Sequence, residues 1–287
     1  MKVASNKISD IIKHYEKLLN DNYDLNSSNQ LLRELISFYI KIPFNEVRFN
    51  LEKRISESQL LDIHFGVKRL LNNEPIQYII GETEFLDIIL KLNKHTLIPR
   101  PETEELVLLI KKTLDKNSSS KLTILDIGTG SGCIAISIQK LTNANVTGVD
   151  ISKDALIQAK ENSILNNAKV DFKEVDILNI DDRNKLGNFD IIISNPPYVQ
   201  NSEKALMQAN VLDYEPSTAL FVENNNPLIF YKAINDFAKD HLNKNGSIFL
   251  EINEYLSDET ASIFKDGFSS TKIINDFRDK KRFCVIN

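Results

Sequence analysis

Four residues, Asn195, Pro196, Pro197 and Tyr198, follow the apolar run Phe189–Ser194, which is typical of a buried strand. Proline fixes φ and cannot donate to a strand ladder, so the proline pair ends the strand and stiffens the turn that carries the Asn195 amide. An asparagine side chain offers one acceptor and two donors, which suits it to hold another planar amide or amino group. Asn and Pro are also common in surface turns, so these four residues alone leave both interpretations open.

A glycine-rich segment follows the run Leu122–Ile127 and forms a second candidate site. Glycines let a cofactor approach the backbone closely. In a dinucleotide-binding fingerprint a third glycine would stand where Cys133 does, which argues against NAD. The order resembles the first motif of class I S-adenosylmethionine-dependent methyltransferases, which implies that Asp126 lies near the methionine end of the cofactor. The candidate cofactor-binding residues here are Asp126, Gly128, Thr129, Gly130, Ser131 and Gly132.

Acidic residues follow the next two expected strands in the order that this resemblance requires. Asp150 closes the second strand, where an acid can accept hydrogen bonds from both ribose hydroxyls, although a helix cap before Ser152 explains it equally well. Asp176 and Ile177 follow the third strand, where adenine would lie. Asn195 then follows the fourth.

Within such a fold, the Asn-Pro-Pro-Tyr run resembles that of enzymes that methylate a nitrogen conjugated to a planar group. An amide nitrogen is a poor nucleophile, so it must be oriented. We expect the Asn195 side-chain oxygen and the Pro196 carbonyl to accept its two N–H groups, with catalysis by proximity and electrostatics. Pro197 and Tyr198 would pack against the flat group. Asn195, Pro196 and Tyr198 are the candidate catalytic residues.

Arg100 stands between two prolines, before the acidic and apolar helical pattern that begins at Pro101. Proline at a first helical turn, followed by Glu102 and Glu104, fits the helix dipole. Capping does not explain Arg100, for which two roles are considered. It is either a cation that meets an anionic substrate group or an ion-pair partner.

The elements that must position these residues are predicted by hydrophobic periodicity. After the Ser-rich link Asn117–Ser120, strand and helix patterns alternate, which predicts an α/β, Rossmann-like, doubly wound sheet of seven strands whose carboxyl ends hold the ligands. The expected strands are Leu122–Ile127, Val146–Val149, Val170–Val175, Phe189–Ser194, Ser247–Ile252, Lys272–Asn275 and Arg282–Ile286.

The first part of the chain has a different pattern. Apolar residues recur at helical spacing from Ile8 to Leu71, and Ser56 and Asn72 are placed to cap the last helix. Short β-rich stretches are expected at Gln77–Ile80 and Phe85–Leu92. We therefore predict a helical domain over residues 1–74, a β-hairpin linker over 75–99 and a catalytic domain over 100–287.

Composition limits the classes of function. The 287 residues are 42% hydrophobic and 26% charged, as in a globular chain, and the net charge of −5 disfavours sequence-independent binding to a phosphate backbone. With no signal peptide or membrane-spanning run, a cytoplasmic protein is expected. Cys133 and Cys284 are interpreted as buried structural thiols, His95 and His241 have no evident partner, and no metal site is expected.

Motifs along nearly the whole chain resemble the PrmC/HemK family of release factor glutamine methyltransferases. That resemblance implies N5-methylation of the glutamine in the Gly-Gly-Gln motif of class 1 peptide chain release factors. It also implies S-adenosyl-L-methionine as cofactor, S-adenosyl-L-homocysteine as product and an N-terminal domain that contacts the release factor. The segments that carry it are Glu74–Tyr78 with Gly81, Phe85, Ile98–Glu104, Gly128–Gly132, Asn195–Tyr198, Tyr214–Pro216, Ala219 with Leu220, and Gly246–Glu251.

The chain departs from the family pattern at three places, 222–227, 253–255 and Lys281 with Arg282, none of which lies in the four motif sites. Two other hypotheses remain. An N6-adenine or other nucleic-acid amino methylase would flip a base into the same position, but such enzymes usually carry a basic recognition region, which this acidic chain lacks. A binding module that has lost catalysis is disfavoured because Asp126, Asp150, Asn195 and Tyr198 are all present. We expect release factors as partners, no membrane, no direct nucleic-acid contact and a monomer.

Overall fold

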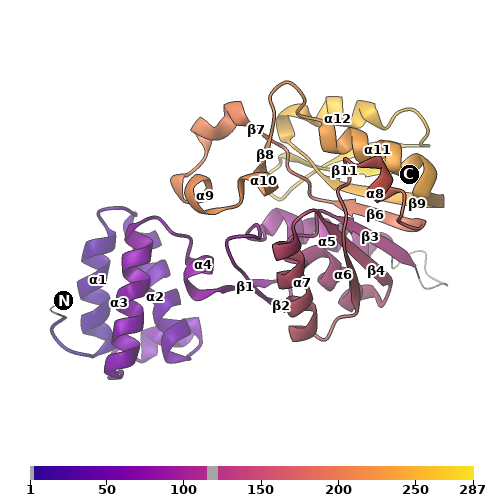
Figure 1. Ribbon diagram of the computed structural model, residues 1–287. Helices are drawn as coiled ribbons and strands as arrows, with labels where there is room; N and C mark the ends of the chain where they lie inside the picture. The colour runs from indigo at the N-terminus through magenta and orange to yellow at the C-terminus, as the bar shows by residue number, and fades with distance from the viewer. Residues whose placement is uncertain (1–2, 115–121) are drawn as a thin grey trace. The chain divides into compact units, whose positions relative to one another are not determined.

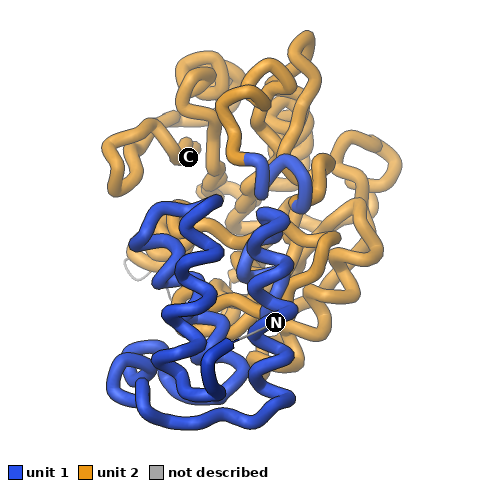
Figure 2. Tube along the Cα trace, turned by 90° about the vertical axis from the view of Figure 1, so that its left-hand side faces the viewer, with its two compact units in different colours: residues 1–81, 209–214 blue, residues 82–208, 215–287 orange. Residues whose placement is uncertain are grey.

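The computed structural model describes residues 3–114 and 122–287, so the link expected at Asn117–Ser120 lies outside the described residues. The chain forms two compact units. Unit 1 comprises residues 1–81 and 209–214, and unit 2 comprises residues 82–208 and 215–287 (Figure 2). Unit 1 is therefore built from two separate segments of the sequence.

Unit 1 is a small helical bundle, as its apolar spacing predicts. Its elements are α1 (Ile8–Leu19), α2 (Leu25–Ile40), the 3₁₀ helix η1 (Phe44–Phe49), α3 (Glu57–Leu71), α4 (Ile76–Ile80) and α9 (Ala209–Tyr214). One face of α1, α2 and α3 is buried in a common core. Ser56 and Gln59 form a capping box at the start of α3, and Asn72 caps its end, so both expected caps are confirmed.

The β-stretch expected at Gln77–Ile80 is wrong, because these residues form helix α4. Ile76 and Ile79, one helical turn apart, are both buried in the core of unit 1. Gly81 ends the helix in the left-handed region at φ 76°. The Arg69 guanidinium, held by Glu74, donates to the last carbonyls of α4. These contacts between segments stabilise a helix that its local sequence does not favour.

Unit 2 contains the seven-stranded sheet, and the predicted fold class is confirmed. The strand order is β10-β11-β9-β6-β3-β4-β5, parallel except for β11, which is antiparallel to both of its neighbours. The sheet strands are β3 (Thr123–Ile127), β4 (Asn145–Asp150), β5 (Val170–Glu174), β6 (Phe189–Ser194), β9 (Leu242–Glu251), β10 (Thr271–Asn275) and β11 (Lys281–Ile286).

The remaining elements of unit 2 cover the sheet or connect its strands (Figure 1). They are β1 (Glu82–Phe85), β2 (Ile88–Lys91), α5 (Pro101–Leu114), α6 (Cys133–Thr142), α7 (Lys153–Leu165), α8 (Ile180–Arg183), β7 (Val199–Gln200), η2 (Asn201–Leu206), α10 (Ser217–Leu220), β8 (Phe221–Val222), α11 (Ile229–His241), η3 (Glu254–Leu256) and α12 (Ser257–Ile263).

Successive side chains of the central strands point to opposite faces of the sheet, so a hydrophobic core forms on each face. In β6, Ile191 and Ile193 join the cluster that packs against α5, α6 and α7. Ile192 points to the other face and joins the cluster under α11. Because side chains alternate along a strand, a continuous apolar run is what a sheet covered on both faces requires.

The expected hairpin is the antiparallel pair β1–β2, with Phe85 opposite Ile88. The amide of Asn162 in α7 bonds both backbone groups of Lys91, accepting from its N–H at 2.7 Å and donating to its carbonyl at 3.0 Å. This side chain satisfies the outer edge of β2 as a neighbouring strand would. No helix within residues 3–114 and 122–287 is long and apolar enough to cross a membrane.

Candidate active site

A cavity of about 380 Å³ lies in unit 2 at the carboxyl ends of β3, β4 and β6. Parallel sheets bind ligands at this edge. The structure brings together eight of the predicted site residues as lining of this one cavity: Gly128, Gly130, Asp150, Asp176, Ile177, Asn195, Pro196 and Pro197. It places Asp126, Thr129, Ser131, Gly132, Tyr198 and Arg100 outside the lining.

The glycine-rich loop presents bare backbone to the cavity. Gly128 and Gly130 have φ values of 73° and 53°, which favour glycine. A Cβ atom at Gly128 would meet no atom within 4 Å, and one at Gly130 would meet only a carbonyl oxygen at 4.0 Å. The space that side chains would occupy is thus left for a ligand, as the cofactor of a class I methyltransferase requires.

Asp150 stands at the end of β4 and holds this loop to the start of α7. Its two oxygens accept N–H groups from Gly130 and from Ser152, each at 2.9 Å. Burial raises the pKa of Asp150, against these hydrogen bonds, which lower it. The Ser152 hydroxyl itself caps α7. Capping of α7 therefore does not account for the whole role of Asp150, because Asp150 also lines the cavity.

Asp126 lies beneath the loop rather than in the cavity lining. Its side chain is fully buried, and Thr129 donates to one oxygen at 2.6 Å. The other oxygen has no hydrogen-bond partner among the described residues. Burial raises the pKa of Asp126 to about 7. Thr129, Ser131 and Gly132 are buried with it and shape the loop from below.

At the other end of the cavity, the residues after β5 form a tight turn. The Asp176 carboxylate accepts the Leu178 N–H at 2.9 Å, and its backbone carbonyl accepts from Asn179 at 3.0 Å. The buried Ile177 supplies apolar lining, to which Phe221 and Phe230 also contribute. An apolar wall beside a carboxylate suits an aromatic base.

Asn195 is tied to a buried network behind the cavity. Its amide nitrogen donates to Thr103 Oγ1 at 3.2 Å, and Thr103 donates to Glu251 Oε2 at 2.8 Å. Tyr198 donates to Glu251 Oε1 at 3.0 Å. Burial raises the pKa of Glu251, against the Thr103 and Tyr198 hydrogen bonds and the charge of Arg282, which lower it.

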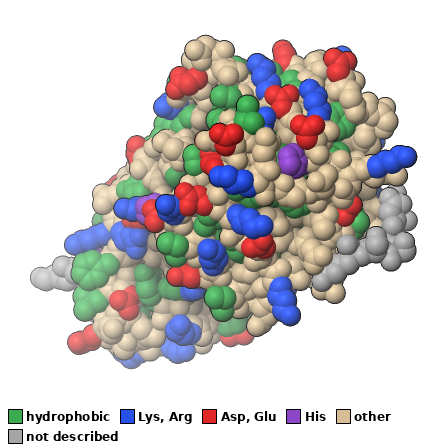
Figure 3. Space-filling model, turned by 45° about the vertical axis from the view of Figure 1, so that its right-hand side comes forward, with side chains coloured by type: hydrophobic (Ala, Val, Ile, Leu, Met, Phe, Trp, Pro, Cys, Tyr) green, Lys and Arg blue, Asp and Glu red, His purple; other side chains and the backbone are tan. Residues whose placement is uncertain are grey.

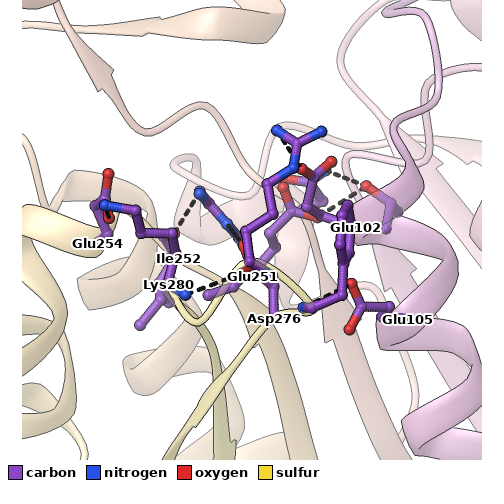
Figure 4. A network of polar contacts seen from close by, with 12 residues as sticks. Glu102, Glu105, Glu251, Ile252, Glu254, Asp276 and Lys280 are labelled. Atoms are coloured by element: carbon purple, nitrogen blue, oxygen red, sulfur yellow. Dashed lines mark hydrogen bonds and ion pairs between the residues drawn. The ribbon is translucent and has the colours of Figure 1, made fainter.

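This network continues towards the C-terminal strands. Arg282 bonds the Asp276 carboxylate at 3.2 Å through Nε, and Figure 4 shows Glu251, Ile252 and Asp276 in one group of polar contacts. Asn253, at one of the three departures from the family pattern, donates to the Tyr198 carbonyl at 3.1 Å. The atypical Asn253 thus supports the turn that carries Tyr198. Tyr198 is anchored at its hydroxyl and is not part of the cavity lining.

Arg100 makes an ion pair, the second of the two roles considered for it. Its guanidinium lies 2.5 Å from Glu215 Oε1, and the other Glu215 oxygen accepts the Ile98 N–H at 3.2 Å. Glu215 is buried, so the pair fixes the stretch around Ile98 to the stretch around Glu215. Contact of Arg100 with a substrate stays a prediction.

Sequence reasoning missed several residues of the site. His95 lines the cavity and lies 3.7 Å from Asp154, and His241 meets the Gly187 carbonyl at 3.1 Å, so the expectation that both lack partners is wrong. Thr218 and its neighbours before β8 also line the cavity. Thr103 was missed too, although it follows Arg100 and Pro101 in a segment that the family pattern includes.

Comparison with known proteins gives the family. Residues 10–81 match the PrmC N-terminal domain, and residues 118–281 match a methyltransferase domain. A release factor glutamine methyltransferase of Flavobacterium psychrophilum is 46% identical over 237 residues, which cover 82% of each chain. One of Streptococcus pneumoniae is 32% identical over 93% of this chain and 97% of its own. The chain belongs to the release factor glutamine methyltransferase family.

A solved structure supports the fold of the catalytic unit of this family member. The 16S rRNA N2 G1207 methyltransferase of T. thermophilus, solved with AdoMet and guanosine, has a TM-score of 0.52 and 17% identity. The match covers 72% of this chain and 49% of that one. At this identity the likeness concerns the fold alone.

Proposed function

We propose that this protein transfers a methyl group to the side-chain amide nitrogen of the glutamine in the Gly-Gly-Gln motif of class 1 peptide chain release factors. One observation carries the proposal: the Asn195 amide lines the same cavity as the bare backbone of Gly128 and Gly130. The names of the relatives supply the substrate. No observation on the described residues favours an adenine instead.

S-adenosylmethionine, when bound, supplies an electrophilic methyl group on a sulfonium sulfur. Gly128, Gly130 and Asp150 would hold it, since they combine open backbone with a carboxylate on the cavity wall. Asp150 retains lone pairs for hydroxyl donors, since two carboxylate oxygens offer about four acceptor sites and the Gly130 and Ser152 N–H groups use two of them. Asp176 and Ile177 would border the base.

Asn195 and Pro196 would orient the glutamine. The Asn195 side-chain oxygen and the Pro196 carbonyl accept the two N–H groups of the substrate amide, which aims its nitrogen and raises its electron density. Pro197, with φ fixed, keeps this turn from moving when the substrate enters. The rate gain comes from positioning and electrostatics, and the product nitrogen can lose its proton late.

We further propose that unit 1 contacts the release factor. Phe49 and Phe65, which are 74% and 57% exposed, are large apolar side chains on the helices of unit 1. Arg48 and Lys68 lie over their rings. On the face drawn in Figure 3, acidic and basic side chains are interspersed, which fits a protein partner better than a phosphate backbone.

The test is incubation with labelled S-adenosylmethionine and a purified release factor, followed by peptide mass analysis. Label is expected on the Gly-Gly-Gln glutamine and not on a release factor whose glutamine is replaced by alanine. Asn195→Ala should lower kcat by about 100-fold or more and change cofactor affinity little, because the lost contact serves the reacting nitrogen. Asp150→Ala should weaken cofactor binding by roughly tenfold or more.

Asn275→Ala, at an exposed position on β10, is the matched control and should leave both quantities unchanged. Label found on nucleic acid, with none on the glutamine, would overturn the proposal in favour of an amino methylase of bases.

A further inference from the structure

The network behind Asn195 has a defined direction of hydrogen bonding. A carboxylate only accepts, so the hydroxyls of Thr103 and Tyr198 must both donate to Glu251. A hydroxyl carries one hydrogen, and that of Thr103 is used on Glu251. Towards Asn195, Thr103 can therefore only accept.

This direction decides which end of the Asn195 amide faces Thr103. The two ends of an amide are nearly equal in size, so packing alone does not distinguish them. A hydroxyl that can only accept requires the NH₂ end, and an oxygen placed there would face a lone pair. The side-chain oxygen is then the end left for a substrate N–H.

We propose that Thr103 and Glu251 are positioning residues, which orient the Asn195 amide with its oxygen towards the substrate nitrogen. A reversed amide would direct its own N–H groups at the N–H groups of the substrate, so it could not hold them. The inference deepens the proposed function and rests on it for its effect on turnover. The orientation itself is a property of the protein alone.

Burial strengthens the hydrogen bonds that link Asn195 through Thr103 to Glu251. Thr103 and Glu251 are each 2% exposed, so solvent does not compete for their hydrogen bonds. The Thr103 and Tyr198 hydroxyls and the charge of Arg282 favour the ionised form of Glu251, against burial, which raises its pKa. Tyr231 donates to the Glu251 main-chain carbonyl at 3.1 Å, which holds the end of β9 in place.

The first arm of the test compares Thr103→Val with Thr103→Ser. Valine keeps the shape and removes the hydroxyl, so kcat should fall by about tenfold, with cofactor affinity and the KM for the release factor within about twofold. Serine keeps the hydroxyl and should retain most of the turnover. Thr113→Val, on the same helix with its hydroxyl bonded to the Leu109 carbonyl, is the control and should match the unmodified protein.

The second arm needs no substrate. The side-chain amide resonances of Asn195, assigned by their loss in Asn195→Ala, should shift in Thr103→Val and stay near their original positions in Thr103→Ser. Unchanged amide resonances in Thr103→Val would overturn the proposal. So would equal losses of kcat in the valine and serine variants, because the hydroxyl would then not matter.

The two arms separate this inference from the proposed function. If the unmodified protein leaves the release factor glutamine unlabelled, the proposed function fails. The amide resonances still decide whether Thr103 orients Asn195.

Discussion

At the scale of single residues, the carboxylates of the site stabilise the protein's own structure through hydrogen bonds that do not depend on a ligand. Asp150 accepts hydrogen bonds from the glycine-rich loop and from the residue that caps α7, and Glu251 accepts hydrogen bonds from two hydroxyls. Asp126 is fully buried under the glycine-rich loop. Only Asp150 among the three reaches the cavity wall. Substitution of any of them therefore tests stability as well as chemistry, and each experiment must measure both.

Asp126 gives a pH-dependent prediction. Its pKa is about 7 in the folded protein, against about 4 in an unfolded chain, so the folded state binds more protons between these values. The Asp126 contribution to the free energy of unfolding must then fall as pH rises from about 4 to 7, by at most about 4 kcal/mol. Asp126→Asn removes that dependence and leaves an acceptor for Thr129.

The measurement is urea unfolding of both proteins at pH 5, 6, 7 and 8. The stability of Asp126→Asn relative to the unmodified protein should increase up to about pH 7 and then level off. A relative stability that is constant over the whole range, or that decreases with pH, would contradict the raised pKa.

Residues at strand ends were predictable, whereas the supporting residues were not. Gly128, Asp150 and Asn195 each follow an apolar run, and parallel strands bring such ends to one edge. Thr103 and Glu251 are 148 residues apart, and no local pattern indicates that they touch. A buried threonine in the first turn of a helix looks like an ordinary helix residue until its partner is known.

At the scale of elements, the sheet was predictable because each strand is a short apolar run between turn signals. All seven strands occur where periodicity places them, although β9 begins at Leu242, five residues earlier than expected. Helix α4 was not predictable. Its five residues are too few to show a helical period, and its carbonyls are satisfied by Arg69 from another helix.

The approach of β4 to the glycine-rich loop gives a second prediction. A Cβ atom at Gly148 would lie 2.8 Å from the Phe172 ring and 2.9 Å from Thr129 Oγ1. Gly148→Ala should therefore cost about 1–3 kcal/mol of stability and weaken cofactor binding, because Thr129 must move. Both are measurable, by urea unfolding and by titration calorimetry with S-adenosylmethionine.

Gly187→Ala is the matched control, since a Cβ atom there meets nothing within 4 Å. It should change neither quantity appreciably. Full stability in Gly148→Ala would show that the strand and the loop can separate at little cost.

At the scale of the whole molecule, the prediction concerns the division into two units. Leu35 is buried in the core of unit 1, so Leu35→Ala should destabilise that unit by about 2–5 kcal/mol. Hydrogen exchange measured by mass spectrometry should then accelerate in residues 3–81 and also in residues 209–214. Leu25→Ala, exposed on the same helix, is the control.

Slow exchange of residues 209–214 in Leu35→Ala, like that of the sheet strands, would show that this segment depends on unit 2. The prediction follows from α9 belonging to unit 1, where the Tyr214 hydroxyl bonds the Asn72 carbonyl at 2.8 Å. Sequence periodicity predicted the helical domain but not that residues 209–214 belong to it, because a pattern within a six-residue helix does not indicate which distant segment it packs against.

The second segment of unit 1 also bears on how this unit could be exchanged for that of another protein. The stretch that matches the PrmC N-terminal domain ends at residue 81, but the unit it forms includes Ala209–Tyr214, inserted within the catalytic part of the chain. A recombination event that exchanged only the first 81 residues would pair a new bundle with an old α9. Inheritance of a new N-terminal unit therefore requires two changes that are separate in the gene. Its surface should evolve by substitution more readily than by shuffling.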